Sequence, residues 1–478
     1  MLASFRDPDG RLLTVDGRII RIIKKSAASD LRAFLSSEAL IEFRKSGKLI
    51  RTDFLDAAEV ESLSAKETVM SVLDDGDEKV FAEHERIPFP SFPYEWPPEM
   101  LYAAAELTLD MAERLLPESI GLKDATPYNL LYLGAKPIFI DLLSFERRDP
   151  GDQTWLPLAQ FSRTFLLPLL VNKHFGVRLD QIFIPHRDGL DPEDVIRLCG
   201  PLQKVRSPFL TLVTLPARLS RRPLAEDTSI YQKHTSKNPE KAKFILGRVF
   251  KSLRRKLESL RPDSNRRSTW SDYMGQNNYT EDYFPIKQQF VEAALAETKP
   301  ERVLDVGCNT GHFSAIAARA GASVVSIDYD PIVVGKVWSQ ASTDNLNILP
   351  LVVNLARPTP GLGWRNMENP AFLERARGAF DGILMLAVIH HMLVSERIPL
   401  KEVMRLAREL TTDLLVIEYV GPQDVMFRRI SRGRDHLHES LTEEYFEGVS
   451  RQYFEITRVQ KLGDTHRRMY MMRRKPGV

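Results

Sequence analysis

The sequence predicts an α/β fold for the C-terminal part of the chain, built on a seven-stranded sheet, with an α+β region before it. Two observations support this prediction: short apolar runs of strand length, and helical patterns of apolar residues between them, such as the one over 400–410. Strands that alternate with helices are typical of βαβ units and a parallel sheet. The predicted strands lie near residues 303–304, 322–328, 349–355, 380–391, 414–420, 454–461 and 468–472.

Polar side chains gather where these strands end. The strand predicted over 380–391 is apolar almost throughout, as expected for a strand buried on both faces. In open parallel sheets, ligands bind beyond the carboxyl ends of the strands. The polar residues at those ends are Asp305, Asp328, Asn354, His390, His391 and Glu418. We therefore expect a ligand site along this edge of the sheet.

Length and composition indicate a globular protein of two or three domains. The chain has 478 residues, of which 43% are hydrophobic and 27% charged. Its net charge of +2 creates no overall field that would favour nucleic acid. No apolar run reaches the roughly 18 residues of a membrane-spanning helix. Two cysteines give no disulfide framework, and the N-terminus lacks the apolar core of a signal peptide, so we expect a cytoplasmic protein.

We expect three parts along the chain: an accessory region over 1–235, an amphipathic helix with a linker over 236–269, and the sheet-containing domain over 270–478. Asp-Gly turns between short apolar runs predict a hairpin at the start of the first part. Helices are expected near 30–46 and 98–116. The amphipathic helix has a basic face, which a solvated surface explains, with RNA or anionic lipid as the alternative.

The most informative stretch is 303–314, which runs from a strand through a glycine turn into a helix. Glycines allow positive φ and close approach to a ligand, and the helix N-terminus offers unpaired N–H groups. A dinucleotide site would have three closely spaced glycines. Here Asp305 precedes the turn, and only Gly307 and Gly311 follow. The acid would repel a pyrophosphate but suits the amino group of an amino-acid ligand.

This pattern resembles motif I of the class I S-adenosylmethionine-dependent methyltransferases, which have a Rossmann-like sheet that ends in an antiparallel hairpin. Asp328 follows Asp305 by 23 residues, close to the offset at which an acid meets ribose hydroxyls. The resemblance puts Asn354 near the adenine, where many relatives carry Asp. It implies S-adenosylmethionine as cofactor and no metal. The cofactor-binding residues it implies are Asp305, Gly307, Cys308, Asn309, Gly311, Asp328, Tyr329, Asn354 and Leu355, with Tyr279 and Lys287 as candidates for the cofactor's carboxylate.

Two further groups are candidates for acceptor chemistry. His390 and His391 follow the fourth strand, and a histidine there could remove the proton that methyl transfer to oxygen or nitrogen releases. A packing role for one or both is the alternative. An arginine cluster follows the fifth strand and suits an anionic acceptor, although a surface salt-bridge network explains it equally well. The cluster comprises Arg428, Arg429, Arg432 and Arg434.

The accessory region contains a second pattern. Asp124 and Asn129 lie between a helix and a strand, and Asp141 ends the next strand. This order resembles the catalytic loop and metal-binding strand of choline-kinase-like phosphotransferases, which implies a base at Asp124 and magnesium at the other two. A convincing glycine-rich phosphate loop is not found in residues 1–60. Backbone capping by these side chains is the alternative interpretation.

The segments 123–129 and 139–146, followed by a methyltransferase-like domain, resemble a nodulation-protein-like group of bacterial methyltransferases over nearly the full chain. This resemblance implies a cytoplasmic enzyme that methylates oxygen or nitrogen of a small molecule or glycan, which the first part presents or recognises. Two alternatives stay open at this point. The accessory region could be an active phosphotransferase, or the chain could be a non-catalytic cofactor-binding module.

Overall fold

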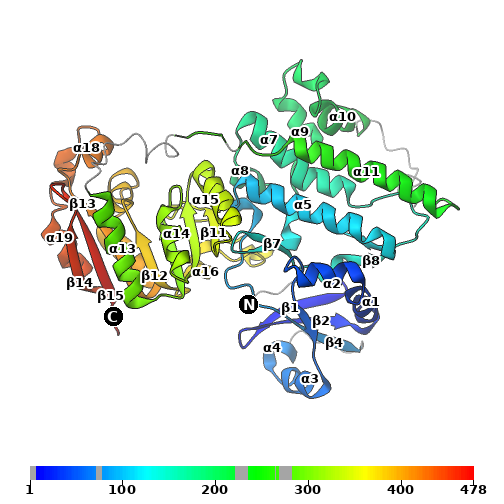
Figure 1. The fold of residues 1–478 in the computed structure, drawn as a ribbon, viewed down its shortest axis with the longest axis horizontal. Coiled ribbons are helices and arrows are strands. Elements are labelled where there is room, and N and C mark those ends of the chain that lie inside the picture. Colours follow the sequence, from blue (N-terminus) through cyan, green and yellow to red (C-terminus); the bar gives the residue numbers. More distant parts are fainter. Residues whose placement is uncertain (1–6, 71–77, 221–234, 264, 269–282, 478) are drawn as a thin grey trace. The chain divides into compact units, whose positions relative to one another are not determined.

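A computed structural model describes residues 7–70, 78–220, 235–263, 265–268 and 283–477 (Figure 1). They divide into two compact units. The first comprises residues 1–94, 98–262 and 362–369, and the second comprises 95–97, 263–361 and 370–478. Within the described ranges, no helix combines the length and the hydropathy that crossing a membrane requires.

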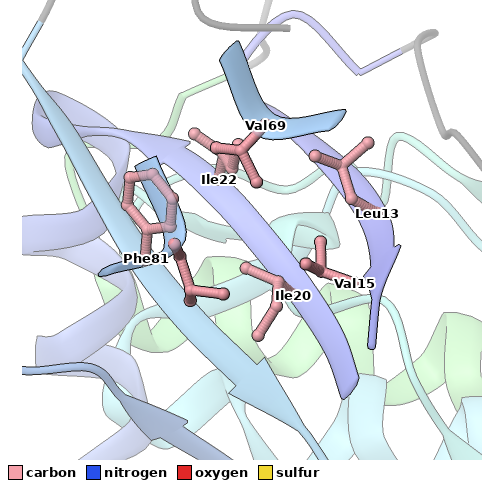
Figure 2. Close-up of a cluster of buried hydrophobic side chains, with 7 residues drawn as sticks. Leu13, Val15, Ile20, Ile22, Val69 and Phe81 are labelled. Atoms are coloured by element: carbon pink, nitrogen blue, oxygen red, sulfur yellow. The ribbon is translucent and has the colours of Figure 1, made fainter. Parts of the chain in front are cut away.

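The first unit begins with a four-stranded antiparallel sheet of order β1-β2-β4-β3. The predicted hairpin is confirmed, because β1 pairs with β2 around a turn in which Asp16 and Gly17 both have positive φ. Figure 2 shows the core of this sheet, where Ile20, Ile22 and Phe81 pack together. The strands are β1 (Gly10–Val15), β2 (Arg18–Lys24), β3 (Thr52–Phe54) and β4 (Lys79–His84).

The single helix expected near 30–46 is wrong, because the structure has two helices there. The helical conformation is interrupted at Ser36 and Ser37. The Ser37 side chain accepts a hydrogen bond from the Leu40 N–H. Serine at this position satisfies an N–H that the new helix leaves unpaired. The helices of this part are α1 (Lys25–Leu35), α2 (Glu38–Lys45), α3 (Ala57–Ser64) and α4 (Glu67–Met70).

Helices dominate the rest of the first unit, around two short strand pairs. The amphipathic helix is confirmed as α11 and packs against α5. Arg254 on its basic face pairs with Asp110 at 2.7 Å, so part of that face belongs to this packing. The strands are β5 (Ile120–Leu122), β6 (Leu130–Leu133), β7 (Lys136–Phe139) and β8 (Phe145–Arg147). The longer helices are α5 (Pro98–Arg114), α7 (Leu167–Phe175), α9 (Pro192–Leu198) and α11 (Pro239–Ser259).

The second unit contains the predicted seven-stranded sheet, of order β11-β10-β9-β12-β13-β15-β14. The first five strands in this order are parallel, and β15 runs antiparallel to both β13 and β14, which confirms the closing hairpin. The strands are β9 (Arg302–Val306), β10 (Ser323–Asp328), β11 (Ile348–Val352), β12 (Phe380–Met385), β13 (Thr411–Val420), β14 (Phe454–Lys461) and β15 (Arg467–Arg474).

Helices connect these strands and pack against the sheet. Helix α14 contacts β9 and β10, α15 contacts β10 and β11, and α17 contacts β12 and β13. Helix α17 has the bounds predicted from its apolar spacing. The helices are α13 (Phe284–Thr298), α14 (His312–Arg319), α15 (Pro331–Thr343), α16 (Phe372–Ala376), α17 (Leu400–Leu410), α18 (Val425–Ser431) and α19 (Glu443–Ser450).

The fourth strand is shorter than predicted. It ends at Met385, and Ala387 follows with a left-handed φ of 56°. A short π-helical turn then begins at His391. The apolar run continues past the strand because Leu386 and Ile389 are buried between the strand and the turn, so hydrophobicity did not mark the end of the strand.

A short N-terminal segment belongs to the second unit. Thr359 donates a hydrogen bond of 2.5 Å to the fully buried Glu95 carboxylate, and Arg375 forms an ion pair with it. These buried contacts attach residues 95–97 to the sheet-containing unit. The division of the chain therefore does not follow one boundary in sequence.

Candidate functional site

The glycine turn between β9 and α14 has a path that other residues could not follow. Gly307 has a φ of 69°, and a Cβ added to it would lie 2.3 Å from Cγ2 of Val388. Gly311 has a φ of 83°, and its Cβ would lie 2.9 Å from Cγ2 of Val337. Positive φ and missing space both favour glycine at these two positions. The turn thus lies directly against α15 and the segment that follows β12.

Asp305, at the end of β9, is a buried carboxylate. Ser314 of α14 donates a hydrogen bond of 2.5 Å to its Oδ2, and Ser326 of β10 donates to the Ser314 hydroxyl at 2.8 Å. All three side chains are buried. Burial raises the pKa of Asp305 to about 6, although the Ser314 hydrogen bond opposes this rise. Burial therefore disfavours the charged form of this carboxylate more than Ser314 and the nearby Lys287 favour it.

Asp328, at the end of β10, forms hydrogen bonds with the turn after β9 and with the turn after β10. Its carboxylate accepts the backbone N–H of Asn309 at 3.1 Å and that of Asp330 at 3.0 Å. Burial raises its pKa also to about 6, against the effect of these hydrogen bonds. Two carboxylates of raised pKa thus lie at the same edge of the sheet, and strongly perturbed acids in a cavity are typical of functional sites.

A cavity of about 510 Å³ opens at this edge. It contains most of the residues predicted to bind the cofactor: Lys287, Asp305, Gly307, Cys308, Asn309, Asp328, Tyr329, Asn354 and Leu355 line it. His391 lines it as well, whereas Gly311 and His390 do not. Tyr279 lies outside the described residues. The size lies within the usual range for small-molecule and cofactor sites.

Sequence inspection missed several residues that line this cavity. Phe284 and Phe313 bring aromatic rings, and Glu396 brings a further carboxylate. Val388 and Met392 come from the segment that was assigned to the fourth strand or its end. No periodic pattern marks them, and only proximity in sequence to the strand ends could have suggested them.

Lys287 belongs to a buried chain of charges. Its ammonium group donates a hydrogen bond of 2.5 Å to Glu418 at the end of β13, and it lies 5.1 Å from the centre of the Phe313 ring. Arg467 binds the other oxygen of Glu418 at 3.1 Å and also pairs with Asp424 at 2.8 Å. Burial acts to raise the pKa of Glu418, but Lys287 and Arg467 hold it below its ordinary value.

The two histidines have different surroundings. His390 is fully buried, and neither of its ring nitrogens has a hydrogen-bond partner among the described residues. Burial lowers its pKa well below the ordinary value. His391 is partly exposed, and its ring contacts that of His390 in a tilted arrangement, with 4.3 Å between ring centres and 41° between the ring planes. Burial lowers the pKa of His391 too, so the imidazole is neutral at pH 7.

In the first unit, the predicted Asp124, Asn129 and Asp141 have protein partners. Gln160 donates to Asp124 at 3.2 Å, and Asn129 donates to the Ser144 hydroxyl at 3.0 Å. Ser144 in turn donates to Oδ2 of Asp141 at 2.6 Å. Arg21 forms an ion pair of 3.2 Å with Oδ1 of Asp141. A guanidinium group thus neutralises the carboxylate that the kinase resemblance would assign to magnesium.

The strand order, the glycine turn and the acid-lined cavity agree with those expected from the resemblance to class I S-adenosylmethionine-dependent methyltransferases. Residues 279–444 match a family model described as a methyltransferase domain. The chain therefore contains a methyltransferase domain.

The chain is similar over nearly its whole length to nodulation protein NoeA of Rhizobium meliloti (strain 1021), with 28% identity over 98% of this chain and 95% of the relative. Among solved structures, it is similar to N-methyltransferase NodS from Bradyrhizobium japonicum WM9, with 13% identity over 41% of this chain and 98% of that one, at a TM-score of 0.31. It is also similar to magnesium protoporphyrin IX methyltransferase from Synechocystis PCC 6803, with 20% identity over 42% of this chain and 89% of that one, at a TM-score of 0.30.

Proposed function

We propose that the protein transfers the methyl group of S-adenosylmethionine to an oxygen or nitrogen atom of an anionic small molecule or glycan. The observation that carries this proposal is the cavity at the strand ends, where two carboxylates of raised pKa, the buried Asp305 and the partly buried Asp328, meet a glycine turn. Carboxylates of this kind suit a ligand with an ammonium group and several hydroxyl groups, because such a ligand compensates their charge.

The cavity residues suit the parts of the cofactor as follows. Asp305 would bind the amino group, and Asp328 would accept hydrogen bonds from the ribose hydroxyls. Asn354 would donate to the adenine, because its amide oxygen already accepts the Ala356 N–H at 2.9 Å. Lys287, oriented by Glu418 at 2.5 Å, would meet the cofactor's carboxylate. Gly307 lets the backbone come close to the ligand.

We assign His391 as the base. It lines the cavity and is neutral at pH 7, so its imidazole can accept the proton that the acceptor oxygen or nitrogen loses. When bound, S-adenosylmethionine supplies an electrophilic methyl group, and the chain has only to align the acceptor and take up the proton. His390 would fix the orientation of His391 through the tilted contact between their rings.

The contacts in the first unit do not favour phosphotransfer. The ion pair between Arg21 and Asp141 replaces the positive charge that a metal ion would bring. The Asn129 amide donates to the Ser144 hydroxyl, which in turn donates to the Asp141 carboxylate. We propose instead that residues 1–235 recognise or present the acceptor.

The two cysteines, Cys199 and Cys308, are both unpaired and buried, which supports a reducing, cytoplasmic location.

A methyl-transfer assay tests this function. The protein would be incubated with S-adenosylmethionine labelled in the methyl group and with fractionated bacterial metabolites and oligosaccharides. Label should appear in an acceptor fraction with the wild-type protein and fall by at least tenfold with Asp328→Ala. An exposed substitution with the same charge change, Asp344→Ala, is the matched control and should leave transfer intact. Transfer by Asp328→Ala at the wild-type rate would contradict the assignment.

A further inference from the structure

A second, larger cavity adjoins the cofactor cavity. Its volume is about 1140 Å³, and it lies between the segment that follows β12 and the segment that follows β13. His391, Ser395 and Ile430 line both cavities, so the two share a wall. This volume slightly exceeds the upper end of the usual range for small-ligand sites, which is roughly 1,000 Å³. The proposed base therefore faces the larger space as well as the methyl-donor site.

Four arginines line this larger cavity: Arg397 from the loop before α17, Arg429 on α18, and Arg432 and Arg434 just after α18. All four are exposed. Within the described part of the chain, none of them forms an ion pair, and no aspartate or glutamate lines the cavity. Among the residues that the structure describes, these arginines therefore form no salt-bridge network, which was the alternative explanation for the cluster.

The position of α18 explains part of this charge but not all of it. Cations near the end of a helix are favoured by its dipole, which accounts for Arg428 and Arg429 in the last turn. Arg397 comes from a different element and still faces the same cavity. Both Arg397 and Arg432 have a left-handed φ, of 55° and 51°, a conformation that disfavours side chains other than glycine. The chain thus holds arginine at two strained positions around one space.

We propose that this cavity, bounded by Arg397, Arg429, Arg432 and Arg434, is the acceptor site and binds a phosphate or carboxylate group of the acceptor. The proposal rests on the proposed function. Guanidinium groups bind both oxyanions through paired hydrogen bonds, and they do so most strongly where no protein carboxylate competes. Apolar side chains such as Leu393 remain in the wall to pack against the uncharged part of the acceptor. An anion held there would place its neighbouring hydroxyl or amino group toward His391.

The chain offers a matched control for this proposal. Arg428 and Arg429 are adjacent on α18 and carry the same charge, but Arg428 hydrogen-bonds Gln423 and does not line the cavity. Substitution of either by glutamine changes the net charge equally. Only a specific site would distinguish the two variants.

The test is calorimetric titration of the full chain, saturated with S-adenosylhomocysteine, with pyrophosphate and separately with citrate at low salt. We expect the wild-type protein to bind at least one of them. Tighter binding of pyrophosphate would indicate a phosphate site, and tighter binding of citrate would indicate a carboxylate site. Arg429→Gln and Arg432→Gln should each weaken binding by about tenfold, while Arg428→Gln changes it less than twofold. Affinity for S-adenosylhomocysteine should be the same in all four proteins.

Three results would overturn the inference: no binding of either anion to the wild-type protein, equal binding by Arg429→Gln and the wild type, or an equal loss in Arg428→Gln. Each is distinct from failure of the proposed function. If S-adenosylhomocysteine binds and the anions do not, only the acceptor site is wrong. If the wild-type protein does not bind S-adenosylhomocysteine, the proposed function fails and the inference fails with it.

Discussion

Substitution of Asp305 by asparagine should stabilise the unliganded protein while it weakens cofactor binding. The carboxylate is fully buried, and its pKa rises from 3.8 to about 6 because burial disfavours the charged form. Asparagine has nearly the same shape and can still accept the Ser314 hydrogen bond through its amide oxygen. The substitution therefore removes the buried charge and little else.

The expected size follows from the pKa shift. A rise of roughly two units in pKa corresponds to about 3 kcal/mol of unfolding free energy that the ionised carboxylate removes from the folded state. A raised pKa of an acid means that stability is fully present below pH 3.8 and is lost as the pH rises to about 6. Asp305→Asn should thus match the wild type near pH 4 and exceed it by about 1–3 kcal/mol at pH 7.5. Loss of the charged hydrogen bond to the cofactor's amino group should weaken binding by about tenfold or more.

Urea unfolding of the ligand-free protein between pH 4 and 8, combined with titration of S-adenosylhomocysteine, measures both effects. Asp344→Asn serves as the control, since Asp344 is a surface residue in an ion pair with Arg319. A variant Asp305→Asn that loses stability at pH 7.5, or gains the same amount at every pH, would refute the reasoning. So would an unchanged affinity for the ligand.

Three further predictions concern other parts of the site. Glu418→Gln leaves the buried charge of Lys287 without its counter-ion, and it should lower the unfolding free energy in urea by about 3–5 kcal/mol. Gly307→Ala should weaken S-adenosylhomocysteine binding and lower the melting temperature, and Val388→Ala added to it should recover only part of the loss, because the positive φ remains. In the wild type, the rate of methyl transfer should fall as the pH drops through the pKa of His391, which lies below 6.5, and His391→Gln should lose that acid limb together with most of the rate.

Contrary results are equally specific. Unchanged urea stability of Glu418→Gln would mean that Lys287 finds water or another partner. Full recovery by the Gly307→Ala/Val388→Ala pair would assign the whole effect to space rather than to φ. An acid limb that persists in His391→Gln would transfer the role of base to another group.

The order of strands and helices could be predicted because their residues form regular local patterns. Helix α17 repeats apolar residues at helical spacing, and its predicted and observed bounds agree. The end of β12 was missed because Leu386 and Ile389 are buried outside the strand, and hydrophobicity does not distinguish the two situations. The break between α1 and α2 depends on the Ser37 cap rather than on an interruption of apolar spacing.

The cofactor cavity was partly predictable for the same reason: its acids and glycines follow strands directly. The pairing of Lys287 with Glu418 was not, because 131 residues separate them and only the sheet brings them together. The arginine-lined cavity could not be predicted from the sequence either. Its arginines were visible as a cluster after the fifth strand, but Arg397 follows the fourth, and only the fold brings it to the same space.

Calorimetric titration of the wild-type protein with S-adenosylhomocysteine at pH 7.5, repeated with Asp305→Ala and Asp328→Ala, tests the central claim most directly, because it needs no knowledge of the acceptor. We predict one binding site per chain in the wild type and an affinity at least tenfold weaker in each variant. Absence of binding to the wild type, or equal affinity in all three proteins, would contradict the placement of the methyl donor at the carboxyl ends of β9 and β10.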